Sequence, residues 1–574
     1  MIEAGLEIVS QEASFELPQE GGESLLKRIV ALYPHSRSSF TEEVVVYLDS
    51  FDGRLYRAGW TLEAATKGRR LEVRLVPLKA GRSHRVMLEE RPRSARDFPA
   101  GFLGEELGRI LEARLLIPRL FDRRAIQSFD LQDRARKIVT RVQRIQSHSF
   151  LEEPGPGSRK GSTRAALSDG IESPPLLLLS GVRGYDAFFE RALSCAKLEL
   201  GHGPKQTSLF QRLALLHGLD PGNDPSKLRI RLDSDGTIEE AVRQILLHLL
   251  GTMKANEKGV LEDLDIEFLH DYRVAIRRTR SILSQLRGVF PKVAEEHYTG
   301  ELRWLGSVTG PVRDLDVLLE NEPMYRRQLG DGFATSLDPL QAFVRKQRES
   351  ERKLLTSALR SKRCQHLIRN WGEFLSGEGE IGAAREMTNL PAWEVASRKI
   401  QKRYKKILRL GRAVGPETPI RRIHDVRIEC KKLRYLLECF GSLFPKKASS
   451  VAVLDLKALQ SNLGDLNDYE VHGELFSTSA TRMMEEGDPP AETMLAVGRL
   501  VAFLEAKREN ERQGFFERFV RFASSETQTH FAEAFGVAGD KHRSIRTKRK
   551  KKRAGDDWKR IKHSKKPGKK GSWR

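Results

Sequence analysis

The chain has 574 residues, of which 39% are hydrophobic and 31% are charged, and its formal net charge is +22 at pH 7. This length exceeds one hydrophobic core and predicts two to four domains. The four cysteines, Cys195, Cys364, Cys430 and Cys439, have no CxxC spacing. They predict neither a disulfide framework nor a zinc site, and they indicate a reducing compartment.

No apolar run approaches the roughly 20 residues of a membrane-spanning helix. The N-terminus, MIEAGLEIVSQE, lacks the basic and then apolar order of a signal peptide. We therefore expect a cytoplasmic protein.

Residues 1–205 predict a domain of mixed strands and helices. VVVYLDSF (44–51) and LEVRLVPLK (71–79) are rich in β-branched residues and alternate in part, which indicates strands. A stretch rich in Gly, Ser and Pro at 152–175 predicts an insertion or linker. A second linker is predicted at 206–236.

The region 237–525 predicts a series of amphipathic helices that contains an internal repeat. LHDYRVAIRRTRSIL (269–283) matches IHDVRIECKKLRYLL (423–437) at an offset of 154 residues. VFPK and LFPK, and the blocks GPVRD and GDLND, match at the same offset, while RESER and RENER match at an offset of 160. We expect two copies, at about 237–377 and 390–525, related by a pseudo-two-fold axis.

Each copy places basic residues at one spacing from a histidine. The residues are His270, Arg273, Arg277, Arg278 and Arg280 in the first copy, and His424, Arg427, Lys431, Lys432 and Arg434 in the second. Offsets of 0, 3, 7 and 10 fall within roughly 80° of a helix surface, beside the apolar stripe. Arg303 and Lys457, equivalent positions in the next block, extend the set.

This pattern predicts paired basic faces with few acidic neighbours, lining a groove that binds an anion. A solvated charged face is the alternative, and it is less compatible with the same register in both copies. Arginine suits phosphate because its fork makes two parallel hydrogen bonds, and lysine adds a mobile charge. The equivalent Asp314 and Asp468 are expected to be structural, as helix caps or arginine partners.

The two His-Asp pairs do not predict a metal site, because such a site needs further ligands and the nearby Arg and Lys would repel a metal ion. No cofactor is expected. A histidine among phosphates gains charge when the anion raises its pKa, so we expect binding to strengthen from pH 8 to pH 6.

These motifs resemble the CHAD family of histidine-bearing α-helical domains. The resemblance rests on HDYRVAIRRTR with LRWLGSVTGPVRDLDVLL in the first copy and on HDVRIECKKLRYLLECF with LQSNLGDLND in the second. It implies two helical bundles with internal symmetry around a basic cavity that binds inorganic polyphosphate. By position, the ligand residues would be His270, Arg273, Arg277, Arg278, His424, Arg427, Lys431 and Lys432.

The N-terminal region is similar to the CYTH domain, an antiparallel β-tunnel. YLDSFDGRLYRAGWTL (47–62) and SGVRGYDAFFERAL (180–193) carry this resemblance. The catalytic Glu-x-Glu-x-Lys signature is not intact, because SQEASFEL (10–17) keeps Glu12 but has Ser10 and Ser14 at the other two positions. The resemblance thus implies an α+β chain with a degenerate CYTH-like domain that is not an enzyme; a triphosphatase or polyphosphatase is the alternative.

The tail 540–574 predicts a disordered basic segment. Positions 541–574 contain 17 Lys and Arg and 2 Asp and Glu, so +15 of the net +22 lies there. Such tails bind polyanions by counterion release. The tail could add affinity for polyphosphate, bind nucleic acid, or only aid solubility, and association with polyphosphate granules is a further expectation.

Overall fold

The computed structural model describes residues 9–18, 22–67, 69–79, 83–153, 170–204, 207–330, 332–333, 335–377, 388–415 and 417–536. These residues form two compact units. The first comprises positions up to Lys227 together with Glu262–Phe268, and the second comprises Leu228–Leu261 and the positions from Leu269 onward. The basic tail, and most of the stretch at 152–175, lie outside the described residues.

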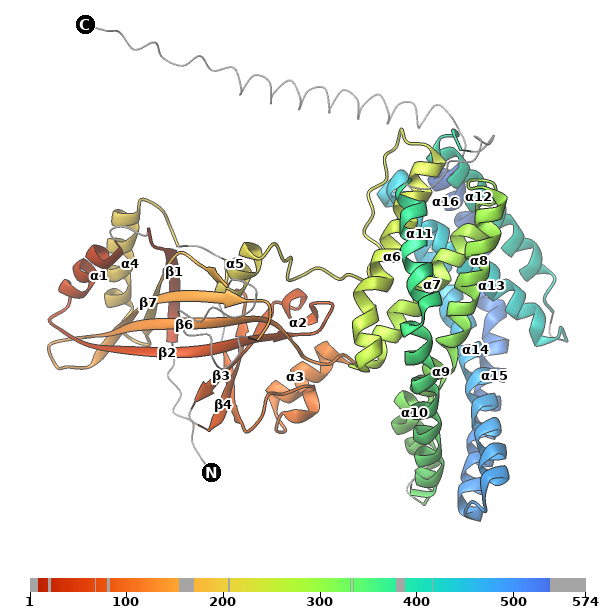
Figure 1. The fold of residues 1–574 in the computed structure, drawn as a ribbon, viewed down its shortest axis with the longest axis horizontal. Coiled ribbons are helices and arrows are strands. Elements are labelled where there is room, and N and C mark those ends of the chain that lie inside the picture. Colours follow the sequence, from red (N-terminus) through yellow and green to blue (C-terminus); the bar gives the residue numbers. More distant parts are fainter. Residues whose placement is uncertain are drawn as a thin grey trace, which may run out of the picture. The chain divides into compact units, whose positions relative to one another are not determined.

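The first unit is built on an antiparallel sheet (Figure 1). Its strands are β1 (Val9–Glu16), β2 (His35–Asp49), β3 (Trp60–Lys67), β4 (Arg70–Pro77), β5 (His84–Leu88), β6 (Ile117–Gln132), β7 (Ile138–Phe150), β8 (Ile171–Glu172) and β9 (Leu176–Val182). Their order is β1-β9-β7-β6-β2-β3-β4-β5, with β8 beside β7. The two strands predicted from 44–51 and 71–79 are confirmed as the end of β2 and as β4.

Five helices accompany this sheet: α1 (Gly22–Ala31), α2 (Arg54–Arg57), α3 (Phe102–Leu111), α4 (Asp186–Leu200) and α5 (Leu209–Leu216). Helices α1 and α4 pack together and cover Phe15 of β1 in one core cluster. Gly184, with φ of 88°, turns the chain from β9 into α4. Helix α5 lies in the predicted linker and packs on Tyr47 and Leu120 of the sheet, so it is part of the first unit.

The second unit is helical. Its helices are α6 (Ile238–Glu262), α7 (Ile266–Gln285), α8 (Lys292–Val308), α9 (Gly310–Leu329), α10 (Asp338–Arg360), α11 (Lys362–Ser376), α12 (Ala392–Arg412), α13 (Ile420–Phe440), α14 (Lys446–Glu486), α15 (Ala491–Phe522) and α16 (Ser525–Phe535). The predicted fold class, an antiparallel sheet domain followed by a helical region, is confirmed. Among the described residues, none of the helices combines the length and apolar character that crossing a membrane requires.

The helices follow one another in the same order in the two copies. Helix α12 begins 154 residues after α6, and α13 begins 154 residues after α7. The α8–α9 pair corresponds to the long α14, which runs without a break. Pro311 stands where the second copy has Asp465, and a proline at the second position of α9 is compatible with a new helix start because it lacks an N–H.

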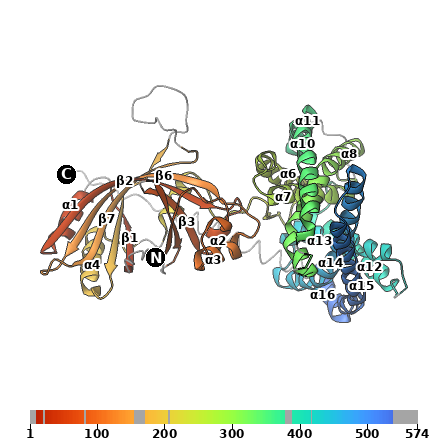
Figure 2. The same ribbon diagram turned by 90° about the horizontal axis from the view of Figure 1, so that it is seen from below.

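The two copies share a hydrophobic core. Leu315 and Tyr325 of α9 and Val344 of α10 are buried in one cluster with Phe476 of α14 and Leu500 of α15. Both views show α9 and α10 running beside α14 and α15 (Figures 1 and 2). This core holds the repeated helices of one copy against those of the other.

Candidate anion-binding site

Helices α7 and α13, which carry the predicted basic faces, meet each other in the second unit. Their apolar stripes are buried, with Tyr272 and Cys430 both fully enclosed. Gln285 of α7 donates a hydrogen bond from Nε2 to the carbonyl oxygen of Lys432 at 3.2 Å. Arg278 of α7 donates to Glu438 of α13 at 2.7 Å. The basic faces of the two copies therefore lie next to each other.

Three predicted residues form the centre of this junction, and we call Arg277, Arg427 and Lys431 the central cations. Arg277 extends from α7, and the other two lie one turn apart on α13. Lys431 remains exposed, but the surrounding protein, followed by the charges of Arg427 and Arg277, lowers its pKa to about 8. Burial also lowers the pKa of Arg427, and Arg277 lowers it further.

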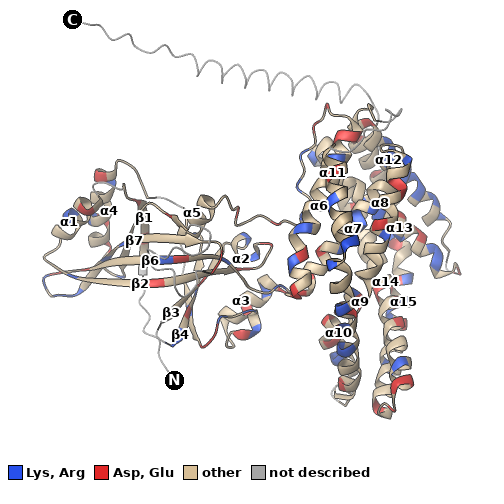
Figure 3. Cartoon of the chain, in the orientation of Figure 1, with Lys and Arg blue, Asp and Glu red and all other residues tan. Residues whose placement is uncertain are grey.

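Among the described residues, the central cations differ from Arg278, Lys432 and Arg434 in having no carboxylate partner, a property that they share with Arg280, Arg303 and Lys457. Figure 3 shows Lys and Arg interspersed with Asp and Glu over the helices of the second unit. Within the described part of the chain, neither Arg277, Arg427 nor Lys431 makes a hydrogen bond or an ion pair, and the Nε atom of Arg427 is buried without an acceptor. The charges thus repel one another, and Asp468 offsets this repulsion only in part, which leaves a cost in free energy that an anion would recover.

Two equivalent aspartates stand near the central cations without forming ion pairs with them. The negative charge of Asp468 of α14 raises the pKa of Arg427 and of Lys431, against the effect of burial. Burial raises the pKa of Asp314 of α9, against the effect of Arg273 and other arginines. The negative charge of each copy therefore lies beside the cationic centre and reduces its potential.

Arg273 is held by the end of helix α8. Its Nη1 donates to the carbonyl oxygen of Gly306 at 3.1 Å and to Oγ1 of Thr309 at 3.0 Å. Burial lowers the pKa of Arg273, and the charges of Arg277 and Arg313 add to this effect. Arg273 therefore fixes the α8–α9 junction while adding its charge to the cluster.

Four predicted residues are paired with carboxylates, so the expectation that these faces have few acidic neighbours is wrong there. Glu438 binds both Arg278 and Arg434, at 2.7 and 2.6 Å. His424 shares a hydrogen bond of 2.6 Å with Glu470. The fourth residue, Lys432, is bound by Glu429.

The buried Glu429 accepts three basic groups. Its oxygens lie 2.6 Å from Arg403, 3.0 Å from Lys406 and 2.9 Å from Lys432. These cations lower the pKa of the Glu429 carboxyl against the effect of its burial. Glu429 thereby ties α13 to α12 through Arg403 and Lys406, and it neutralises Lys432 on its own helix. Glu429 lies three residues before Lys432, and Glu438 lies four residues after Arg434, so the sequence alone could have indicated these two pairs.

The remaining predicted residues lie around this centre. Burial lowers the pKa of Arg280, and the nearby charge of Arg303 lowers it further. Arg303 and Lys457 are exposed, and His270 is half-buried. The described residues contain no group of three or more His, Cys, Asp and Glu side chains arranged to hold a metal ion.

The copies differ at the position of Glu470. Its equivalent in the first copy, Asp316, is buried and binds Arg348 of α10 at 2.5 Å. Asp316 thus pairs with an arginine of α10, whereas Glu470 pairs with the histidine of its own copy, although the sequence motifs match. This difference could not be read from the motif, because the partners come from other helices.

In the first unit, the inward charges neutralise one another. The buried Arg124 lies 2.6 Å from Asp122 and 3.6 Å from both Glu43 and Glu63. Arg74 lies 3.0 Å from Glu63. Burial raises the pKa of Glu12, the one residue of the catalytic signature that is kept, and Glu63 adds to the effect. The arginines here already have protein carboxylates as partners.

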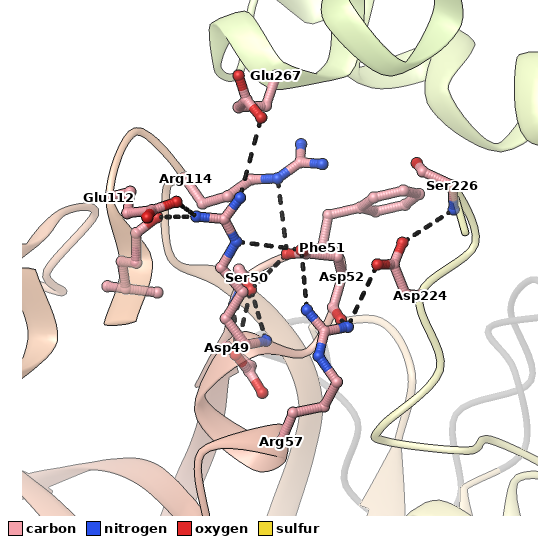
Figure 4. Close-up of polar contacts among 12 residues, drawn as sticks. Asp49, Ser50, Phe51, Asp52, Arg57, Glu112, Arg114, Asp224, Ser226 and Glu267 are labelled. Carbon is pink, nitrogen blue, oxygen red and sulfur yellow. Dashed lines mark hydrogen bonds and ion pairs between the residues drawn. The ribbon is translucent and has the colours of Figure 1, made fainter. Parts of the chain in front are cut away.

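The 47–62 motif of the CYTH resemblance forms a structural turn (Figure 4). Asp49 accepts backbone hydrogen bonds from Ser50, Leu55 and Tyr56 at 2.7, 2.9 and 3.0 Å. Asp52 pairs with Arg54, Arg57 and Arg114 at 3.1, 3.1 and 3.5 Å, and Arg114 and Arg54, with a hydrogen bond from Ser50, lower its pKa against the effect of burial. An antiparallel sheet agrees with the CYTH resemblance, which itself stays a prediction.

Residues 244–477 match the model of the CHAD domain family. These residues of the helical unit therefore form a CHAD domain, as their motifs predicted. Two uncharacterized proteins of Mycobacterium tuberculosis, MT2285 of strain CDC 1551 and Rv2226 of strain H37Rv, are each 26% identical to the chain over 298 residues, which is 50% of this chain and 52% of theirs. The chain thus spans about half the length of these curated relatives.

Two solved structures are also similar. The CHAD domain from the plant Ricinus communis is 27% identical and aligns over 51% of this chain and 95% of its own, with a TM-score of 0.42. PptA from Streptomyces chartreusis is 15% identical and aligns over 50% and 99%, with a TM-score of 0.39. Because both TM-scores are below 0.5, the family assignment rests on the match at 244–477.

The substitution Glu429→Gln is expected to destabilise the helical unit by on the order of 3 kcal/mol, because it leaves three cations around a buried site without their counter-charge. Urea unfolding followed by circular dichroism at 222 nm measures this loss. Glu505→Gln, at an exposed position of α15, is the control and should change the stability by less than about 0.5 kcal/mol. Equal stabilities of the two variants would contradict the role given to Glu429.

Proposed function

We propose that the CHAD domain of this protein binds inorganic polyphosphate at the central cations, without catalysing a reaction on it. The observation that carries this proposal is the meeting of Arg277, Arg427 and Lys431, from two equivalent helices, with no protein anion bound to any of them. A phosphate chain would supply the missing negative charge. The CHAD match supports the same ligand, because the family resemblance implies polyphosphate.

The geometry favours a ligand with repeated phosphates over a single small anion. The two central cations of α13 are one turn apart, and Arg277 approaches from α7, so the charge is spread over two helices. Arg280 and Arg303 add exposed or half-buried charge further along the first copy. A linear polyanion can contact such separated cations at once, and each contact adds to affinity.

The first unit supports a non-enzymatic assignment. Phosphoryl-transfer sites need carboxylates that hold a metal ion and free basic groups that hold the phosphates. In this unit Arg74 and Arg124 are bound by Glu43, Glu63 and Asp122 instead. A triphosphate would have to break these ion pairs before it could bind there.

Replacing all three central cations by glutamine is expected to lower the affinity for long-chain polyphosphate by on the order of a hundredfold, at about 1 kcal/mol per charge. The slope of log affinity against log salt concentration should fall by about 2, at ~0.7 per lost contact. Filter binding over a salt series measures both quantities.

The matched control for this triple variant replaces the exposed Lys292, Lys362 and Arg369 by glutamine, which removes the same net charge. This control should keep most of the affinity and of the salt slope. If both triple variants lose equal affinity, the binding depends on net charge rather than on the central cations. A competition experiment with DNA of equal charge, on the chain with and without residues 541–574, distinguishes polyphosphate binding by this domain from nucleic-acid binding by the tail.

The affinity for polyphosphate is expected to rise about fivefold from pH 9 to pH 7, because Lys431, with a pKa of about 8, gains its proton in this range. The sign follows from linkage: a polyanion binds the charged lysine more tightly and raises its pKa in the complex. In Lys431→Arg the guanidinium stays charged, so the affinity should vary much less over this range. An unchanged pH profile in this variant would exclude Lys431 as the source.

The substitution Asp468→Asn is expected to increase the affinity for polyphosphate about threefold to fivefold, because it removes a negative charge beside Arg427 and Lys431. Asp465→Asn, at an exposed position one turn earlier on α14, is the matched control and should change the affinity much less. Titration of both variants at one salt concentration makes the comparison. A loss of affinity in Asp468→Asn, with thermal unfolding unchanged, would assign the aspartate to the binding surface instead.

A further inference from the structure

We propose that Lys431 is a site of acylation by small acyl phosphates, which the neighbouring arginines bind by their phosphate group. This inference uses the cation cluster of the proposed polyphosphate site, but it requires only that the cluster accept one phosphate. It adds a covalent modification that would regulate binding. The argument combines three properties of Lys431: its exposure, its neighbours and the state of its amine.

The first property is access. Lys431 is exposed on α13, and no described residue accepts a hydrogen bond or forms an ion pair with its ammonium. The next residue, Lys432, shows the opposite arrangement, because its Nζ is held 2.9 Å from Glu429. Of these two adjacent lysines, only Lys431 has a nitrogen available for a reaction.

The second property is the charge that faces Lys431 from the surrounding helices. Arg277 acts on it from α7, and Arg427 and Arg434 act from α13 itself. Asp468 of α14 is the opposing charge. Arg434 is already bound to Glu438, whereas Arg277 and Arg427 have no partner. These two guanidinium groups are therefore available to bind a phosphate dianion next to the amine.

The third property is protonation. An ordinary lysine titrates near 10.4, so only on the order of 1 in 1,000 is neutral at pH 7.4. With a pKa of about 8, Lys431 has an appreciable neutral fraction at the same pH. Only the neutral amine is a nucleophile, and lowering the pKa beside cationic groups is a recognised way to activate a lysine. The surrounding protein is the largest cause of this shift, followed by Arg427 and Arg277, so in the free protein a partly neutral amine lies beside the two arginines that would bind the phosphate.

The reaction balances without an oxidant or a further co-reactant. The lone pair of Lys431 Nζ attacks the acyl carbon, and the bond between that carbon and the bridging oxygen breaks. Inorganic phosphate leaves on the arginines, and it takes up the proton that the nitrogen loses. The product is a neutral amide, so one of the three central cations is removed.

The test treats the full chain with acetyl phosphate near pH 8 and measures acetylation at each lysine by mass spectrometry. Lys431 is expected to be acetylated at least about tenfold faster than Lys457, an exposed lysine of α14, because of its larger neutral fraction. Changing Arg277 and Arg427 to glutamine should remove most of this preference. Similar rates at Lys431 and Lys457 in the unmodified sequence would overturn the proposal.

A neutral acetyl ester, p-nitrophenyl acetate, tests the phosphate recognition. The preference for Lys431 should be smaller with this reagent, because the arginines have no phosphate to bind. An equal preference with both reagents would overturn the role of the arginines. Since no polyphosphate is present in these reactions, their outcome is independent of whether the proposed polyphosphate binding holds.

Discussion

The cationic centre depends on one constraint, the contact of α7 with α13. Gln285 bonds to the backbone of Lys432, and Arg278 bonds to Glu438, so the two equivalent helices are fixed side by side. This contact brings Arg277 toward Arg427 and Lys431, although like charges would otherwise separate. Burial of the apolar stripes of α7 and α13, which include Tyr272 and Cys430, contributes free energy that opposes this repulsion.

The two copies together carry more basic residues on these faces than the three that form the centre. Glu429 and Glu438 bind five of the basic residues on or near α13, and these pairs stabilise the packing of α13 on its neighbours. Such buried or half-buried pairs can fix geometry without adding much net stability. The unpaired cations are then the ones that retain potential for an external anion. This division between structural and available charge limits the binding surface to the junction of the two copies.

In the first unit, by contrast, the arginines described above are paired with carboxylates of the protein. Its Arg124 and Arg74 lie among Glu43, Glu63 and Asp122, so these two arginines already have protein carboxylates as partners. This pairing agrees with the proposal that the first unit is not an enzyme.

The sequence by itself determined the repeat, the helical class of the second unit and the residues on each basic face. These properties depend on local periodicity and on matching motifs, which a linear chain displays. It also predicted β2 and β4, because their β-branched residues favour strands. The offset of 154 residues matched the motif at 423–437, which lies in α13, to the motif at 269–283, which lies in α7.

Only the tertiary structure decided which of these cations have partners. Asp316 and Glu470 occupy equivalent positions, yet one binds Arg348 and the other His424, because the partners come from helices that are distant in sequence. The proximity of Arg277 to Lys431 likewise depends on how α7 crosses α13. Helical periodicity can place a charge on a face, but the electrostatic potential at that face is the sum over every helix packed against it.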